Sequence, residues 1–350
     1  MVKVIVNSLL LLFLISCSSN EGGTTNKRNS FLPDAQYNGD YVWLISDTST
    51  WKGALGKTIQ ADYSNPYSVF PQDEKSYRVT FSEYIGLSDL MKRWEVMIFA
   101  VDLNKDTRLK QYVLRKFHSK LKDHDIEYES FMLKDQWANG QLVVYLIGAS
   151  EQALLRGYKK QEQAIREMVD ATVMNRAVKS VNKRSKNKIS IQEVDSAYSF
   201  NIQIPAEYTS AGNLEKALWY LKDIPTGYQA IVFYSTSYED SSDFNSEKII
   251  QERDKHLSFV QGESDEETMV TERRAIVEDK VISIGNQYCK EFRGLWRLKG
   301  AFTGGPFVHY AVYNPNTKMI DHVDVFVMAP GDKKKPLIRE LEAIVQTIKF

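Results

Sequence analysis

The sequence has no excess of charge of either sign and no apolar run long enough to span a membrane. Lys plus Arg and Asp plus Glu each number 45, so the formal net charge is zero. This balance gives no reason to expect nucleic acid or an anionic membrane surface as a partner. Apolar residues make up 43% of the chain, enough for the core of one large domain or two small ones.

Residues typical of metal sites are also scarce. The five histidines (118, 124, 256, 309 and 322) do not occur at any metal-ligand spacing. The segment from Asp102 to Asp106 has the carboxylate spacing of an EF-hand loop, but Thr107 and Val113 stand where that loop needs Gly and Glu. Asp102 and Asp106 are better interpreted as the turn and the cap before a helix. No metal and no cofactor is expected.

A phosphate-binding loop is suggested by WKGALGKT, residues 51–58, but the motif is incomplete. The P-loop pattern requires glycine five residues before Gly56, and that position is Trp51. The strand VMIFAVD, residues 96–102, could serve as a Walker B strand, although buried strands that end in Asp are common. We therefore expect no nucleotide partner and interpret the stretch as a loop-to-helix junction, with Asp47 as N-cap and Trp51 packed on the core.

The N-terminus has the proportions of a signal peptide. Lys3 precedes an apolar run from Val4 to Ile15, which is shorter than the roughly 20 residues of a membrane span. The following Leu14-Ile15-Ser16-Cys17 resembles the lipobox of bacterial lipoproteins. That resemblance implies cleavage of residues 1–16 and attachment of lipid to Cys17, with a membrane as partner through the anchor. The alternative is an ordinary signal peptide or a buried N-terminal helix.

Residues 17–37 are expected to form the lipidated cysteine and a flexible tether, because residues 18–30 are polar and lack periodicity. Ser18 follows the cysteine at the position where Asp would resemble an inner-membrane retention signal, and only Glu21 is acidic in this segment. These features favour the outer membrane, with the periplasmic face preferred over the cell surface.

Lipidation of Cys17 leaves Cys289 without a disulfide partner. An unpaired cysteine in an oxidising compartment is expected to be buried. A reactive nucleophile is the alternative, but NQYCKEF, residues 286–292, contains no histidine.

The order of strands and helices predicts an α+β protein of two related units, residues 38–185 and 186–350, each a mainly antiparallel sheet with helices packed on one face. In the first unit we expect strands near residues 77–84, 94–101, 128–133 and 141–148, and a long helix from about Ser150 to Lys183. In the second we expect strands near residues 198–205, 228–235, 291–299, 305–313 and 318–328, and helices over residues 246–260 and 336–348. The basic segment KSVNKRSKNK, residues 179–188, is interpreted as a solvated helix end and a linker between the units.

His309 and His322 lie on the two strands that flank the turn Asn314-Pro315-Asn316-Thr317. If Asn314 pairs with Thr317, the two histidines face each other, with Asp321 and Asp324 close by. This group is a candidate polar or catalytic site, but no nucleophile signature accompanies it. Exposed histidines on a sheet are the simpler interpretation.

Residues 293–310, RGLWRLKGAFTGGPFVHY, concentrate aromatic and basic side chains around paired glycines. Aromatic residues and arginine are enriched at binding hot spots, and glycine permits close approach of a partner backbone. The alternative is a bulged loop that covers the core with its own aromatic side chains. The candidate binding residues are Arg293, Trp296, Gly304, Gly305 and Phe307.

Four short motifs give the chain a family resemblance: WKG at 51–53, RGLW at 293–296, GGPF at 304–307, and APG followed by KKK and IRELEAI at 329–344. Together they resemble an uncharacterised family of Bacteroidota lipoproteins that carries a domain of unknown function. The resemblance covers most of the chain from about Asn38 onward. It implies location and architecture, but no reaction.

Three functions remain open from the sequence. The first is a lipid-anchored envelope protein that binds or scaffolds a peptide, a glycan or another envelope protein. The second is an envelope hydrolase that uses His309, His322 and Asp324. The third is a structural lipoprotein without a ligand.

Overall fold

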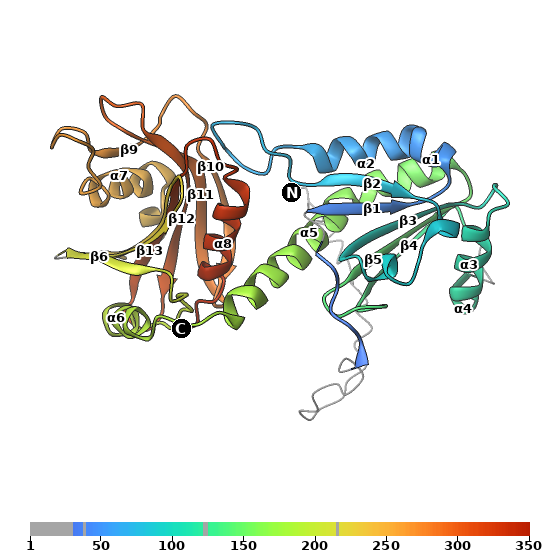
Figure 1. Ribbon diagram of the computed structural model, residues 1–350, viewed down its shortest axis with the longest axis horizontal. Helices are drawn as coiled ribbons and strands as arrows, with labels where there is room; N and C mark the ends of the chain where they lie inside the picture. The colour runs from blue at the N-terminus through green and yellow to red at the C-terminus, as the bar shows by residue number, and fades with distance from the viewer. Residues whose placement is uncertain (1–30, 38–39, 122–124, 215–216) are drawn as a thin grey trace, which may run out of the picture.

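The computed structural model describes residues 31–37, 40–121, 125–214 and 217–350. Two β-sheets lie at opposite ends of the molecule, and the long helix α5 runs from one to the other (Figure 1). The predicted signal peptide, Cys17 and His124 lie outside the described residues. Within the described ranges, no helix is both long and apolar enough to cross a membrane.

The first sheet has five strands in the order β2-β1-β3-β5-β4. All neighbouring pairs are parallel except β4 with β5. The elements of this unit are β1 (Tyr41–Ile45), α1 (Thr48–Lys52), α2 (Ala54–Ser64), β2 (Arg78–Ser82), β3 (Val96–Asp102), α3 (Arg108–Lys116), α4 (His118–Leu121), β4 (Tyr128–Lys134), β5 (Leu142–Gly148) and α5 (Glu151–Lys183).

The prediction of a mainly antiparallel first sheet, covered on one face, is wrong. Helices α2 and α5 pack on one face of this sheet, and α3 and α4 pack on the other. Every residue of β3 and β5 is buried. Continuous apolar runs of this kind are typical of parallel strands that are covered on both faces.

The second sheet has eight strands in the order β10-β11-β12-β13-β8-β7-β6, with β9 paired to β11, and all pairs are antiparallel. Helix α8 covers one face and α7 the other. Its elements are α6 (Lys188–Tyr198), β6 (Thr209–Leu214), β7 (Ala217–Ile224), β8 (Gly227–Ser237), α7 (Ser246–His256), β9 (Met269–Thr271), β10 (Glu278–Ile284), β11 (Gln287–Leu298), β12 (Gly304–Asn314), β13 (Met319–Met328) and α8 (Lys335–Val345).

The two units are therefore not copies of one fold, since they differ in strand order and strand direction. The strand expected at residues 198–205 is also wrong: α6 ends at Tyr198, and the following segment only forms isolated bridges. Phe200, Ile202 and Ile204 are buried there, so the alternating pattern reflected packing on the core rather than sheet pairing.

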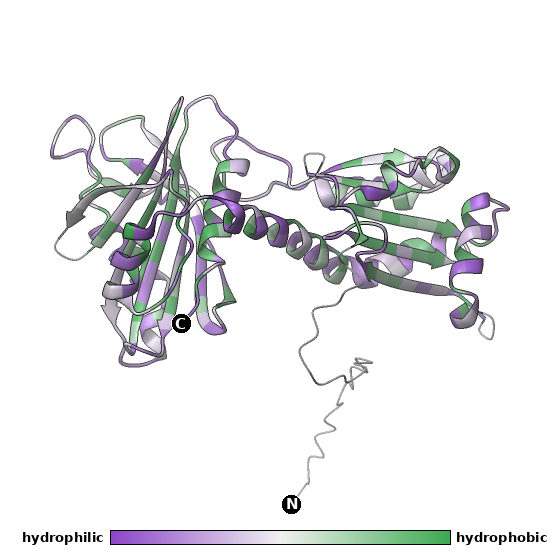
Figure 2. Ribbon diagram, turned by 60° about the horizontal axis from the view of Figure 1, so that its bottom comes forward, coloured by the Kyte–Doolittle hydropathy of each residue, from purple (hydrophilic) through white to green (hydrophobic). Residues whose placement is uncertain are grey.

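Helix α5 belongs to both hydrophobic cores. Leu154, Tyr158 and Val169 pack on the first sheet, whereas Val181 packs in the core of the second unit. Hydrophobic and hydrophilic residues alternate along this helix in Figure 2. The loop between α2 and β2 makes a second connection, because Phe70 is buried in the core of the second unit.

Several local predictions are confirmed. Asp47 caps α1 by accepting a hydrogen bond from the Thr50 backbone, and the Trp51 ring stacks on Phe81. Cys289 is fully buried, and burial raises the pKa of its thiol. The turn at Asp102 forms as expected, but the cap of α3 is Thr107 rather than Asp106.

Candidate binding cleft between the two units

The aromatic, glycine-rich region is not an exposed groove. Trp296 and Phe307 are each only 1% exposed, in the core between the sheet and α7. The Trp296 indole donates a hydrogen bond to the Val327 carbonyl over 3.3 Å. The expectation of a binding groove at these residues is therefore wrong, because their side chains belong to the core.

The paired glycines serve packing within the sheet. A Cβ atom at Gly305 would lie 2.0 Å from the Val327 carbonyl oxygen, and one at Gly304 would lie 2.4 Å from the Trp296 carbonyl oxygen. Only glycine allows the backbones to approach so closely at these positions. They accommodate neighbouring strands of the same chain.

The strand register that was expected to place His309 opposite His322 also differs from the prediction. Asn314 pairs with Met319 rather than Thr317, so His309 lies opposite Asp324. The two histidines still touch, since His309 Nε2 lies 3.0 Å from His322 Nδ1. The loop between the strands is two residues longer than the sequence interpretation assumed, which shifts the register accordingly.

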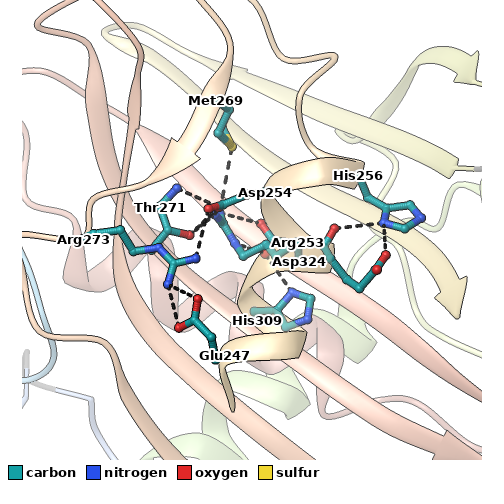
Figure 3. A network of polar contacts seen from close by, with 10 residues as sticks. Glu247, Arg253, Asp254, His256, Met269, Thr271, Arg273, His309 and Asp324 are labelled. Atoms are coloured by element: carbon teal, nitrogen blue, oxygen red, sulfur yellow. Dashed lines mark hydrogen bonds and ion pairs between the residues drawn. The ribbon is translucent and has the colours of Figure 1, made fainter. Parts of the chain in front are cut away.

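These residues form a sealed network under α7, which we call the buried cluster: Arg253, Asp324, His309, His322 and Thr236. Arg253 Nε lies 2.7 Å from Asp324 Oδ2, and His309 Nδ1 lies 2.9 Å from the same oxygen. His322 Nε2 continues the chain to Thr236 Oγ1 over 2.8 Å. Figure 3 shows Arg253 from α7 reaching Asp324 beside His309.

Arg253, Asp324 and both histidines are 0% exposed. Burial lowers the pKa of His309 and of His322, and both rings are thereby kept neutral. Burial would raise the pKa of Asp324, but Arg253 and His309 lower it overall. The interpretation of His309 and His322 as exposed histidines on a sheet is therefore wrong, because neither side chain has solvent-accessible surface.

The opposite face of the same strands lines an open cavity of about 690 Å³ between the two units. Side chains alternate between the faces of a strand, so Glu291 and Arg293 of β11 and Tyr310 of β12 point away from the buried cluster and toward α8. Helix α5 and the loop before β2 provide the other wall, and Figure 1 shows this blue loop reaching toward β10.

Arg293 lies at the centre of the cleft. Its Nε lies 2.7 Å from Glu291 Oε1, and its Nη2 lies 2.5 Å from Glu342 Oε1 on α8. Burial alone would lower the pKa of Arg293, but the carboxylates of Glu342 and Glu291 outweigh it and hold the pKa well above its usual value. Of the five predicted binding residues, this is the one that lines the cleft.

Tyrosine side chains contribute to the same cleft. The Tyr67 hydroxyl, on the loop before β2, donates to Glu342 Oε2, and its ring lies 4.8 Å from the Arg339 guanidinium. The Tyr77 hydroxyl donates to Asp170 Oδ1 over 2.6 Å. The first unit thus supplies tyrosines to a site whose floor belongs to the second unit.

Tyr310 is different, because its hydroxyl is buried and has no hydrogen-bond partner among the described residues. Burial raises the pKa of Tyr310, and the charges of Glu291 and Glu342 raise it further, so the hydroxyl keeps its proton. A buried hydroxyl without a partner costs roughly 1–3 kcal/mol. Tyr310 is 0% exposed, like the two histidines, but unlike them it lines the cavity, so a ligand that displaces neighbouring side chains there can satisfy its hydroxyl.

The sequence analysis missed Tyr67, Tyr310, Arg339 and Glu342. One signal was present: Glu291 and Arg293 are charged residues at alternate positions of a strand that also buries Cys289 on the same face. Arg339 and Glu342, one turn apart on an otherwise buried helix, are a second signal. Charged residues on a helix or strand face that packs on the core indicate either an internal ion pair or a ligand-binding site.

Comparisons with known families assign no activity. Residues 38–182 match the family model described as Domain of unknown function (DUF8532), and residues 185–347 match the one described as Domain of unknown function (DUF4837). No curated protein matches the chain.

Solved structures show a distant likeness. One is LpqN, involved in cell envelope biogenesis of Mycobacterium tuberculosis, at 11% identity and a TM-score of 0.28, covering 43% of this chain and 82% of that one. Another is the Ran-binding protein Mog1p of Saccharomyces cerevisiae, at 10% identity and a TM-score of 0.27, covering 43% and 88%. At these TM-scores the likeness carries no argument about function. The chain is thus similar to two domains of unknown function, over residues 38–182 to DUF8532 and over residues 185–347 to DUF4837.

Proposed function

We propose that this protein is a lipid-anchored binding protein of the cell envelope whose ligand occupies the cleft between the two units. In this proposal Cys17 holds the protein to the outer membrane, and the folded body faces the periplasm. The observation that carries the binding role is the Tyr310 hydroxyl, which has no partner among the described residues and lies on the floor of a 690 Å³ cavity. Cavities of about 300–1,000 Å³ with a few convergent polar groups are typical of small-molecule sites.

The ligand set expected from the sequence was a peptide, a glycan or another envelope protein. The cleft favours a small ligand or a short segment of a larger one, because both units and α5 enclose it. The hydrolase alternative has no supporting observation, since His309, His322 and Asp324 line neither the cleft nor the two other pockets found among the described residues.

The binding role can be tested by filling the cleft from its edge strand. Lys280 and Val281 are exposed neighbours on opposite faces of β10. Lys280 pairs with Glu291 and lines the cleft, whereas Val281 pairs with Lys290 on the other face of the sheet. Lys280→Trp should block the cleft, and Val281→Trp is the matched control, since tryptophan is tolerated in strands.

Hydrogen exchange of β10 and of residues 67–77 is then measured with a panel of envelope saccharides and short peptides. We expect at least one compound to slow exchange in the wild type and in Val281→Trp, but not in Lys280→Trp. If no compound slows exchange, or if Lys280→Trp responds equally, the proposal of a ligand in this cleft is refuted and the structural-lipoprotein hypothesis gains support.

The anchor is tested separately by labelling cells with radioactive palmitate. The label should enter the wild-type chain and be lost in Cys17→Ala, because in this proposal the acyl chains are attached at that cysteine. The same variant should leave the membrane, since each buried acyl methylene contributes roughly 0.8 kcal/mol to attachment. Equal labelling of both chains would refute the lipidation.

A further inference from the structure

The charges that line the cleft nearly cancel. The lining contains four cationic and five anionic side chains, namely Arg166, Lys280, Arg293 and Arg339 against Asp170, Glu278, Asp279, Glu291 and Glu342. A site for a phosphate or another strong anion would carry an excess of cations. The lining of this cleft has no such excess.

Six of these nine charges are paired with one another, Arg339 pairs with Asp40, and Asp279 pairs with Lys290. Lys280 Nζ lies 3.2 Å from Glu291 Oε1, Arg166 Nε lies 3.3 Å from Asp170 Oδ2, and Arg293 is held between two carboxylates. A charged ligand would have to compete with a partner that is already in place. An uncharged ligand can bind without breaking any of these pairs.

Paired ionic groups keep spare hydrogen-bonding capacity. A guanidinium has five N–H donors and a carboxylate has about four acceptor positions, so each retains free directions after one ion pair forms. Donors and acceptors thus alternate over short distances on the cleft floor, as between Arg293 and Glu291. A hydroxyl group both donates and accepts, and therefore fits between such neighbours.

Tyr310 adds a protonated hydroxyl that has no hydrogen-bond partner among the described residues. Its hydroxyl keeps its proton and, among the described residues, has no partner although it lies buried next to the Arg293 network. A ligand hydroxyl can accept a hydrogen bond from Tyr310 and donate one to a neighbouring carboxylate.

We propose that the ligand of this cleft is an uncharged, hydroxyl-rich molecule of the saccharide class, with Tyr310 reading one of its hydroxyl groups. This inference rests on the proposed function of the cleft and specifies its ligand. Tyr67 and Tyr77, from the first unit, place aromatic rings at the opposite wall.

The test is calorimetric titration of the folded chain with N,N′-diacetylchitobiose and cellobiose as uncharged probes. A disaccharide that contains glucuronate and a short lysine peptide serve as charged probes of similar size. Tyr310→Phe should weaken binding of an uncharged probe about tenfold, the effect of one hydrogen bond. Tyr234→Phe is the matched control, because the Tyr234 hydroxyl is likewise buried without a partner in the described part of the chain but lies on the face of the buried cluster.

Binding of an uncharged probe that Tyr310→Phe weakens and Tyr234→Phe leaves unchanged supports the inference. Binding of only the charged probes, or equal loss in both variants, overturns it. If neither uncharged probe binds, the saccharide class is refuted. In each of these cases the exchange experiment with Lys280→Trp decides separately whether the cleft binds anything, so failure of the ligand class and failure of the proposed function are distinguishable. Urea unfolding of each variant verifies that it is folded.

Discussion

His309 and Tyr310 are neighbours on β12, and they belong to two polar regions that differ in almost every respect. His309 points under α7 into the buried cluster, where both of its ring nitrogens have partners. Tyr310 points toward α8 and the floor of an open cleft, where its hydroxyl has no partner among the described residues. Both regions contain ionisable residues on core strands, so residue type alone does not show which of the two is a binding site.

The difference shows how an internal polar network can be separated from a binding site. A satisfied network leaves no group for a ligand, whereas a cavity next to an unsatisfied donor does. Ionisable residues alone do not distinguish the two cases. The presence of an adjoining cavity and of unpartnered groups does, and the following predictions test that distinction from the largest expected effect to the smallest.

Arg253→Met should give the largest loss. The substitution leaves Asp324 buried without its main cationic partner, so the free energy of unfolding should fall by about 3–5 kcal/mol. Adding Asp324→Asn to this variant removes the uncompensated charge and should recover a large part of the loss. Urea unfolding measures both variants. A change below about 1 kcal/mol in Arg253→Met would contradict the view that this network stabilises the fold.

Acidification should give the second-largest loss in the free energy of unfolding, through the buried cluster. The pKa values of His309 and His322 are lowered in the folded chain, so below about pH 6.5 the unfolded chain binds protons that the folded chain does not. The free energy of unfolding should therefore fall as the pH falls from about 7 to about 5. Each tenfold difference in proton affinity between the two states is worth about 1.4 kcal/mol.

Asp321 acts in the opposite direction within this window, because burial raises its pKa to about 6 despite hydrogen bonds from Ser235 and Asn314. Its protonation stabilises the folded chain as the pH falls. The two effects are separated by His322→Gln, which should lose less stability than the wild type between about pH 7 and pH 5. Parallel pH profiles of the two proteins, measured by urea unfolding, would show that His322 does not titrate as proposed.

Tyr310→Phe should have the smallest effect on stability. Its hydroxyl makes no hydrogen bond to any described residue, so its removal should not lower the free energy of unfolding and should raise it by about 1 kcal/mol, because the cost of burying the unpartnered hydroxyl is relieved. The comparison is Tyr198→Phe, which removes a buried hydrogen bond of 2.7 Å to the Phe233 carbonyl and should cost more. A larger loss in Tyr310→Phe than in Tyr198→Phe would show that the cleft hydroxyl is structural.

The local elements were largely predictable from the sequence. The helical pattern from Ser150 to Lys183 matches α5, and the apolar run from Val96 to Asp102 is β3. Strand direction was not predictable in the first unit, because an apolar run looks the same in a parallel sheet and in a buried antiparallel one. The register of β12 and β13 failed for a related reason: it depends on the loop conformation at Lys318, which has a positive φ of 58°.

The candidate site was only partly within reach of the sequence. Arg293 was identified as a candidate, but the reason was its position among aromatic residues, and those residues belong to the hydrophobic core. Tyr67 lies far before Glu291 in the sequence and Glu342 lies well after it, so no local pattern connects these three residues. Only the packing of the loop before β2 and of α8 against β11 brings them to one cleft.

The sequence by itself determined most helices and strands, the burial of Cys289 and the failure of the nucleotide and calcium motifs, because these depend on periodicity and on the residues a motif requires. Tertiary structure decided which face of β11 and β12 is sealed and which is open. That choice depends on where α7 and α8 pack and on the reach of α5 and the loop before β2, which bring distant residues such as Tyr67 and Glu342 into contact. The function proposed for the chain therefore depends on contacts between residues 275 positions apart.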